Sequence, residues 1–221
     1  MQIEQWFPIH IGFAHNPFHK EIEDELTRQC VKIKKSYKKD FEEFRKRSIK
    51  NDSQSPLLDW FKFQSNGSYK LLEDQKFDKL HNWIDNQIRE FAETLGFVDK
   101  LKCEAGWFNI YEKYEYADYH HHRPSALSCV YFLNCEENAG AKLFIRNSND
   151  ALIHYCDDPN FDANGPNSTT KSSIIPLMYH DPFPGKLVVF SSHLEHAVQQ
   201  HNTDNLRITL SYNYTDYKVY K

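Results

Sequence analysis

Three consecutive histidines in the segment YADYHHHRPSALSCVYFLN, residues 116–134, form a dense group of side chains that can bind metals. In a β-strand, residues i and i+2 point to the same face, so His120 and His122 are aimed together and His121 points away. Neutral imidazole binds iron, copper, nickel and zinc, but two ligands from one strand need a third from elsewhere in the fold. The spacing therefore predicts a metal site that a distant residue completes.

The segment FPGKLVVFSSHLEHAVQQ, residues 183–200, supplies a candidate for that third ligand. An apolar strand ends in a turn there, and His196 begins the next β segment. We therefore expect His196 to join His120 and His122.

An arginine stands eleven residues after His196, inside the apolar alternation NLRITLSYNY, residues 205–214. An unpaired buried charge is costly, so Arg207 should meet an anion. Thr209 shares its strand face, and a guanidinium fork with a hydroxyl suits the distal carboxylate of a dicarboxylic acid. The alternative is that Arg207 pairs with an internal Asp or Glu.

These side chains need a framework of β-strands, and the second half of the sequence has the pattern of short strands. Trp107, Asn109 and Tyr111 alternate with Phe108 and Ile110. Further short apolar runs, separated by Gly, Asn, Pro and Asp, are ALSCVYFLN, AKLFIRN, SIIPLMYH, GKLVVFSS and LRITLSYNY. Many short strands between turns predict a barrel or jelly roll. The polar stretch 147–170 is predicted to be an excursion at its mouth, with the hypothetical role of a lid.

The first hundred residues predict two amphipathic helices joined by a loop, residues 51–70, with a short strand. The first helix has apolar side chains at helical spacing at Ile22, Leu26, Ile33, Tyr37, Phe41 and Phe44. The second runs from about Leu71 to Leu95, with Gly96 at the position of a C-terminal cap. We predict an α+β domain in which residues 1–100 are a helical flank and residues 101–221 form the β core.

The composition limits the partners of the protein. The 221 residues are 40% hydrophobic and 15% aromatic, which is enough to fold, and 27 basic against 31 acidic residues give a net charge of -4. No basic field or cluster favours a nucleic acid, and no apolar run approaches the length of a membrane span. We see no secretory signal and no CxxC pair among five cysteines, so we expect a cytoplasmic protein with reduced thiols. A leftover apolar helix face could form a homodimer.

Five motifs, taken together, resemble a known enzyme superfamily. They are WFN at 107–109, HHH at 120–122, SCVYF at 128–132, PGKLVVFSSHLEHAV at 184–198 and RITLSYN at 207–213. The set is similar to the 2-oxoglutarate- and iron(II)-dependent oxygenases, and most similar to an uncharacterised branch found in marine bacteria and phages. The resemblance covers about residues 103–214, with Cys129 and Ser191 where that branch has glycine and proline.

The resemblance implies a double-stranded β-helix, a jelly roll of the cupin-like type, with the helical flank packed on it. It implies that iron(II) is bound by His120, His122 and His196 and that 2-oxoglutarate is bound by Arg207 and Thr209. Lesser expectations are that Asn109, Tyr111 and Ser128 line the same cavity. With dioxygen as co-reactant, the implied reaction decarboxylates 2-oxoglutarate to succinate and hydroxylates a substrate, in the cytoplasm of the cell or, for a phage protein, of its host.

The usual second ligand of that superfamily is a carboxylate, whereas a histidine stands at that position here. A shift of register would instead pair His120 with Asp118, which shares its strand face. Two other functions stay open: a non-catalytic barrel that binds a metal or a small acid, and a three-histidine cupin-like dioxygenase in which Arg207 binds a substrate carboxylate directly. The substrate is either a small molecule or a protein side chain.

Overall fold

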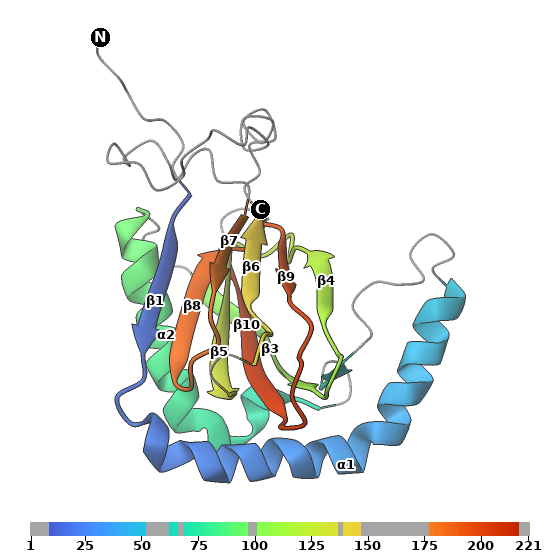
Figure 1. The fold of residues 1–221 in the computed structure, drawn as a ribbon. Helices are drawn as coiled ribbons and strands as arrows, with labels where there is room; N and C mark the ends of the chain where they lie inside the picture. Colours follow the sequence, from blue (N-terminus) through green and yellow to red (C-terminus); the bar gives the residue numbers. More distant parts are fainter. Residues whose placement is uncertain are drawn as a thin grey trace.

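Two antiparallel β-sheets face each other in the computed structural model, which describes residues 9–51, 62–65, 69–96, 101–136, 139–146 and 177–216 (Figure 1). The major sheet has the strand order β1-β8-β5-β10-β3-β2, and the minor sheet has the order β4-β9-β6-β7. The strands are β1 (Ile11–His15), β2 (Phe63–Gln64), β3 (Leu101–Tyr111), β4 (Ala117–His120), β5 (Leu127–Asn134), β6 (Leu143–Arg146), β7 (Leu177–His180), β8 (Lys186–Ser191), β9 (His196–Val198) and β10 (Arg207–Asp216). This is the predicted double-stranded β-helix.

The major sheet is buried on both faces, and the alternation along its strands assigns a chemistry to each face. On β10, Ile208 and Leu210 belong to the apolar cluster on the outer face, whereas Arg207 and Thr209 point between the sheets. The outer face is mostly apolar. The inner face has apolar side chains toward β8 and polar ones toward β3 and β10. The period of two thus positions a polar cavity inside an apolar barrel.

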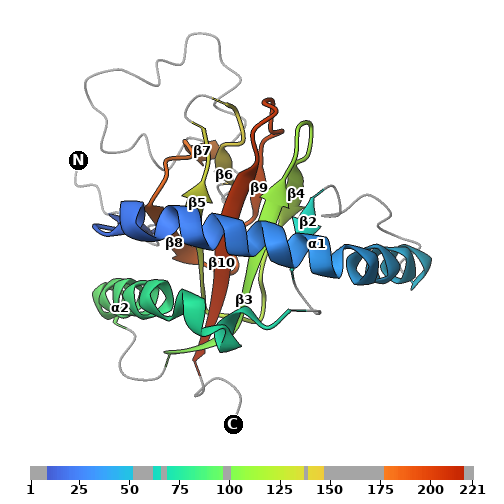
Figure 2. The same cartoon turned by 90° about the horizontal axis from the view of Figure 1, so that it is seen from below.

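Two helices cover the outer face of the major sheet (Figure 2). The first is α1 (His19–Asn51), which contacts β5, and the second is α2 (Asp78–Thr94), which contacts β8. Their buried side chains join those of the sheet in one cluster, with Leu26, Cys30 and Ile33 from α1 and Leu80, Ile84, Ile88 and Ala92 from α2. The predicted helical flank is therefore packed on the β core as expected.

The second helix begins later than the sequence indicates. Residues Leu71–Glu73 and Gln75–Phe77 form two 3-10 turns, and the carboxylate of Asp74 between them accepts a hydrogen bond from the backbone N–H of Lys76, which caps the start of the second turn. Gly96 has a φ of 76°, the left-handed conformation predicted for a C-terminal cap.

One strand of the major sheet was not predicted. β1 pairs with β8 along its whole length, and its second residue, Gly12, packs against α2 so closely that a Cβ would lie 2.6 Å from Cδ2 of Phe91. The glycine weakens the strand pattern in the sequence, but it allows the helix to approach.

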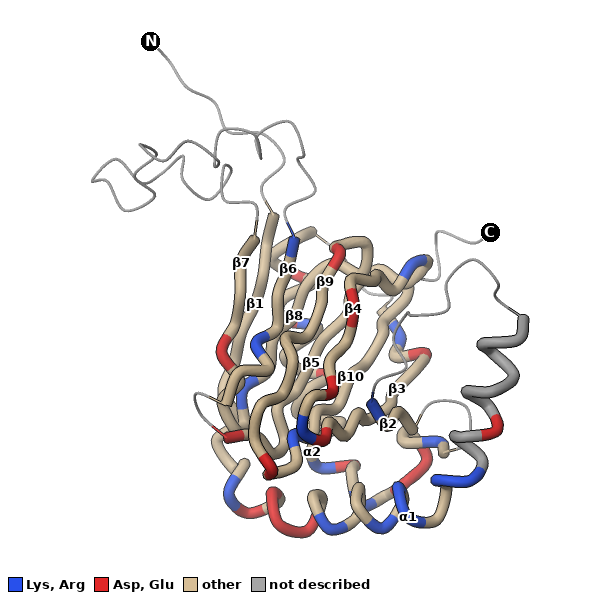
Figure 3. The backbone as a smooth tube through the Cα atoms, turned by 45° about the vertical axis from the view of Figure 1, so that its right-hand side comes forward, with Lys and Arg blue, Asp and Glu red and all other residues tan. Residues whose placement is uncertain are grey.

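Several sequence predictions fall outside the described residues: the excursion at 147–170 and the side chains of Phe41 and Phe44. Within the described residues, Cys30, Cys103, Cys129 and Cys135 form no disulfide, and no helix is long and apolar enough to cross a membrane. Figure 3 shows both acidic and basic residues along α1, the acidic ones mainly in its first turns and the basic ones after them, as expected for a solvated helix face.

Candidate metal centre

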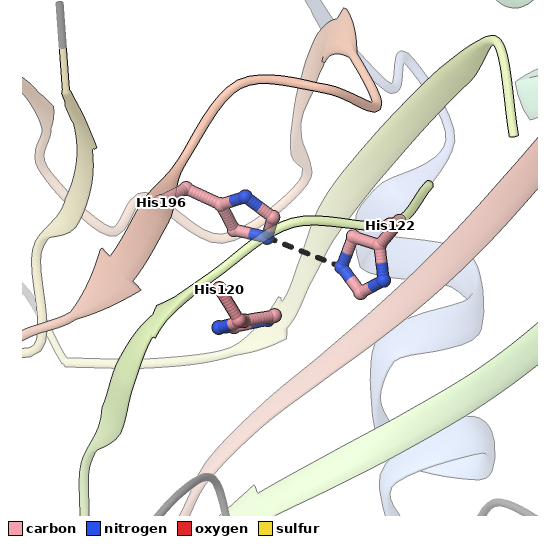
Figure 4. A group of neighbouring side chains, drawn as sticks. All are labelled: His120, His122 and His196. Atoms are coloured by element: carbon pink, nitrogen blue, oxygen red, sulfur yellow. Dashed lines mark hydrogen bonds between the residues drawn. The ribbon is translucent and has the colours of Figure 1, made fainter. Parts of the chain in front are cut away.

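Three imidazoles converge between the two sheets (Figure 4). His120 ends β4, and His122 lies two residues beyond that end. His196 begins β9, which pairs with β4 so that His120 and His196 are register partners. One nitrogen from each ring lies within 4.8 Å of the others, and the Nε2 atoms of His122 and His196 are 3.2 Å apart. The structure thus brings together the three histidines that the spacing pointed to.

Hydrogen bonds to the backbone fix how two of the rings are turned. Nδ1 of His120 is 2.7 Å from the carbonyl oxygen of Asp118, and Nδ1 of His196 is 3.0 Å from that of Leu194. A carbonyl oxygen only accepts, so Nδ1 carries the proton in both rings and Nε2 carries the lone pair. This is the arrangement in which an imidazole binds a metal through Nε2.

His196 is held in its neutral form. It is 3% exposed, and burial is the main reason why its pKa lies well below the ordinary value, followed by the neighbouring imidazoles of His120 and His122. A metal competes with protons for imidazole nitrogen, so the low pKa keeps His196 ready to bind a metal at neutral pH.

Asp118 does not join the group, although a shifted register would have placed it there. Its Oδ1 accepts a hydrogen bond of 2.8 Å from the backbone N–H of Tyr119, and the cluster of ligand atoms contains His122 instead. His121 is exposed, as predicted.

The predicted anion-binding arginine lies in the same cavity. Arg207 is fully buried, its guanidinium carbon lies 4.6 Å from the ring centroid of Tyr111 and 5.3 Å from that of Phe132, and none of its three nitrogens has a hydrogen-bond partner among the described residues. Burial lowers the pKa of Arg207, yet a guanidinium stays protonated in proteins. No described Asp or Glu pairs with it, so the internal salt bridge considered above is not found there.

The other expected residues also line this cavity: Asn109, Tyr111, Ser128 and Thr209. Asn109 donates to Oγ of Ser211 at 3.4 Å, and its buried Oδ1 has no hydrogen-bond partner among the described residues. Ser128 donates to Oδ1 of Asn213 at 2.8 Å, and its hydroxyl lies 2.7 Å from that of Ser192. A hydrogen-bonded polar strip therefore extends along β10 beside the histidines.

Some lining residues were missed by the sequence reasoning. Ser211 and Asn213 continue the alternation that begins at Arg207, so the signal was present and was followed only as far as Thr209. Trp107, whose ring centroid lies 5.3 Å from that of His122, is part of the cavity wall. Lys62 and Gln64 come from the helical flank, where no pattern in the sequence indicated a site.

The residues present fit a divalent first-row metal together with an anionic ligand. Three neutral imidazoles suit such a metal, and the buried guanidinium nitrogens match the two oxygens of a carboxylate. A metal ligated by three protein nitrogens keeps further positions for other ligands.

Comparisons with known proteins agree with this site. Residues 105–213 match the family described as "Putative 2OG-Fe(II) oxygenase", where 2OG is 2-oxoglutarate. No curated protein matches the chain in sequence.

Solved structures show the same fold at low identity. A prolyl hydroxylase from Trichoplax adhaerens, in complex with a peptide fragment of the oxygen degradation domain of hypoxia inducible factor, has a TM-score of 0.62 and 14% identity, over 94% of this chain and 84% of that one. AviO1 from Streptomyces viridochromogenes Tue57 has a TM-score of 0.55 and 13% identity, over 93% and 90%. A prolyl-4-hydroxylase from Pseudomonas putida has a TM-score of 0.51 and 15% identity, over 94% and 93%.

Proposed function

We propose that this chain, whose residues 105–213 match a family of 2OG-Fe(II) oxygenases, is a hydroxylase of that superfamily and decarboxylates 2-oxoglutarate to succinate. We assign the iron to His120, His122 and His196, and the far carboxylate of 2-oxoglutarate to Arg207 and Thr209.

The observation that carries the proposal is the guanidinium of Arg207. It is fully buried, it faces the cavity of the three histidines, and its nitrogens find no hydrogen-bond partner among the described residues. A buried charge with unmet hydrogen bonds costs free energy unless a ligand supplies the acceptors. A dicarboxylate that reaches from the metal to Arg207 would supply them.

Dioxygen is the oxidant of the proposed reaction; iron(II), when bound, would activate it, and 2-oxoglutarate would supply two of the electrons that reduce it. The protein supplies the orientation. The hydrogen bonds of His120 and His196 to backbone carbonyls fix their metal-binding nitrogens, and Arg207 with Thr209 fixes the far end of the cosubstrate. Phe190, whose ring centroid lies 4.7 Å from that of His196, forms an apolar wall on one side of the centre together with Val130 and Val198.

The prolyl hydroxylases among the solved structures support hydroxylation as the outcome, because they place that chemistry on this fold. At 14% and 15% identity they do not carry a substrate over to this chain.

Succinate is the product that tests the proposal. The metal-free protein is reconstituted with iron(II) and ascorbate and is given 2-oxoglutarate in air without a further substrate. We expect slow formation of succinate that is abolished in His196→Ala and strongly reduced in Arg207→Met. Bound iron without any succinate would contradict the proposal.

A second candidate follows from the histidine that stands where the superfamily usually has a carboxylate. Three histidine ligands would also suit a dioxygenase that does not use 2-oxoglutarate, with Arg207 binding the substrate carboxylate. Consumption of dioxygen without succinate would favour this candidate.

A further inference from the structure

The side chains of β10 divide the cavity wall into successive levels. Because every second side chain of a strand points to the same face, Arg207, Thr209, Ser211 and Asn213 face the cavity in that order. Two residues of an extended strand rise about 6.6 Å, so Asn213 lies about 20 Å of strand beyond Arg207. The two residues thus mark opposite ends of this wall.

The metal centre lies at the levels of Ser211 and Asn213. Trp107 is the register partner of Ser211, and its ring centroid is 5.3 Å from that of His122. The backbone N–H of His122 donates at 2.8 Å to the carbonyl oxygen of Ser192, whose hydroxyl belongs to the hydrogen-bonded group of Asn213. Asn213 is therefore placed beside the metal centre and away from Arg207.

This placement separates the cosubstrate from the substrate. A short diacid that reaches from the metal to Arg207 occupies the levels between them. The substrate has to approach the same metal, and the levels left to it are those at the Asn213 end. A polar group at that end is in position to bind the substrate.

Two serines hold the amide of Asn213. Ser128 donates to Oδ1 of Asn213 at 2.8 Å, and its hydroxyl lies 2.7 Å from that of Ser192. Ser128 has one hydrogen, which it gives to Asn213, so Ser192 donates to Ser128. The Nδ2 group of the half-buried Asn213 has no hydrogen-bond partner among the described residues, and Asn213 lines the cavity. The chain thus orients an amide donor that a ligand can reach.

The charged side chains of the described lining lie at the other end of the cavity. They are Lys62 and Arg207, and both adjoin the ring of Tyr111, at 5.7 and 4.6 Å from its centroid. Tyr111 is the register partner of Arg207, so it belongs to the level furthest from Asn213. An ionised group beside Asn213 would lose hydration without meeting a charged side chain of the described lining, so this end suits an uncharged acceptor.

We propose that the substrate carries an amide and that Nδ2 of Asn213 donates a hydrogen bond to its carbonyl oxygen. An amide carbonyl is a strong uncharged acceptor. Asn213 acts as a specificity-determining residue, and Ser128 is a positioning residue that keeps the donor turned into the cavity. This inference rests on the proposed function, since it takes the metal and Arg207 as the sites of the cosubstrate.

The test uses the full-length protein with Mn(II) in place of iron and with saturating 2-oxoglutarate, so that no turnover occurs. The probes are a library of small primary amides, each with its thioamide and its carboxylic acid. The thioamide keeps shape and neutrality, but its sulfur is a weak acceptor. Thermal shift finds the binders, and calorimetry measures their dissociation constants. We expect wild-type binders to be amides that bind about tenfold or more tightly than their thioamides and acids.

Variants locate the effect. Asn213→Leu removes the amide, and Asn213→Asp keeps an acceptor for Ser128 but has no N–H. Both should lose the preference for amide over thioamide. Asn86→Asp, at an exposed site on α2, is the matched control and should behave as the wild type. Ser128→Ala keeps Asn213 but frees its amide to turn, so it should reduce the preference, and it locates the effect if the variants of Asn213 do not fold.

A library in which no amide binds more tightly than its thioamide and its acid would overturn the proposal, and so would an unchanged preference in Asn213→Leu. An Asn213→Leu protein that weakens 2-oxoglutarate as much as Arg207→Met does would also overturn it, because Asn213 would then serve the cosubstrate. The affinity of the wild type for 2-oxoglutarate is measured first. If it is absent, the proposed function fails, and if it is normal without an amide preference, only this inference fails.

Discussion

The chemistry of the cavity depends on which nitrogens of a few side chains carry protons. The backbone carbonyls of Asp118 and Leu194 set the tautomers of His120 and His196, and the third ring comes from His122. A neutral three-nitrogen donor set leaves the full charge of the metal in place, whereas a carboxylate ligand would lower it. The site is thus built to hold anions.

Our first prediction separates the histidine triplet by position. His122→Ala should weaken the binding of Co(II), a spectroscopic substitute for iron, by at least about 100-fold, since it removes one of three ligands. His121→Ala, which alters the exposed neighbour, should leave the affinity unchanged. Calorimetric titration of the metal-free proteins measures both. If Asp118→Ala strongly weakened the binding of Co(II) and His122→Ala did not, Asp118 and not His122 would be the second ligand.

Arg207 should destabilise the ligand-free protein, although it binds the carboxylate of the ligand. Because its buried charge has no hydrogen-bond partner among the described residues, Arg207→Met should stabilise the ligand-free fold by about 1–4 kcal/mol. With Mn(II) and 2-oxoglutarate the order should reverse, since only the wild type gains the carboxylate. Urea unfolding in the two conditions measures this. A variant that is less stable in both would show that Arg207 has an anionic partner within the protein.

At the scale of the elements, α2 couples the stability of the fold to pH through His81. Its ring stacks on Phe77 at 5.9 Å and meets the edge of Tyr212 on β10 at 5.3 Å, and burial lowers its pKa from 6.5 to about 4 against the opposing charges of Asp78 and Asp74. The unfolded chain therefore binds a proton before the native one does. The stabilisation is complete above pH 6.5 and is lost as the pH falls toward 4.

We therefore expect the wild type to lose about 2 kcal/mol more stability than His81→Phe when the pH falls from about 7 to about 5. Urea midpoints at the two pH values measure the difference. His121→Phe, at an exposed site, should follow the wild type. Equal pH dependence in wild type and His81→Phe would mean that His81 has the same pKa in the native and in the unfolded state.

The periodic elements were predictable from the sequence, and the aperiodic ones were not. Strands with both faces buried, such as β5 and β10, are recognisable in the sequence as continuous apolar runs between turn residues. The apolar residues of α2 recur with a clear 3.6-residue spacing. β1 was not predicted because Gly12 and the exposed Phe13 interrupt the alternation of buried apolar and exposed polar residues. The 3-10 turns escaped because they depend on one hydrogen bond of Asp74.

At the scale of the molecule, the flank and the β core share one apolar cluster between the helices and the major sheet. Removing α1 and α2 would expose the outer face of that sheet, including Tyr131, Leu210 and Tyr212.

Residues 101–221 alone should therefore form no cooperative fold. We expect this fragment to bind the dye ANS and to lack a near-ultraviolet dichroism signal, whereas the full chain unfolds in one transition. A fragment with a sharp urea transition would show that the β core is an independent domain.

The same view of the molecule explains how far the candidate site could be predicted. Four site residues could be predicted from local sequence patterns, because strand alternation and the cost of a buried charge both act locally: His120, His122, His196 and Arg207. The position of Lys62 in the cavity could not be predicted, because it depends on the pairing of β2 with β3 across more than forty residues of sequence. Long-range pairing of a two-residue strand leaves no periodic signal.

The central claim is that one cavity holds a metal on three histidines and 2-oxoglutarate on Arg207. The most direct measurement is an anaerobic titration of the metal-free protein with iron(II) and then 2-oxoglutarate, while the weak visible charge-transfer band of a chelated 2-oxo acid is recorded. We predict a band in the wild type, no band in His196→Ala, and a band in Arg207→Met that needs at least about 30-fold more 2-oxoglutarate. Confirmed binding of iron without any band at saturating 2-oxoglutarate would contradict the claim.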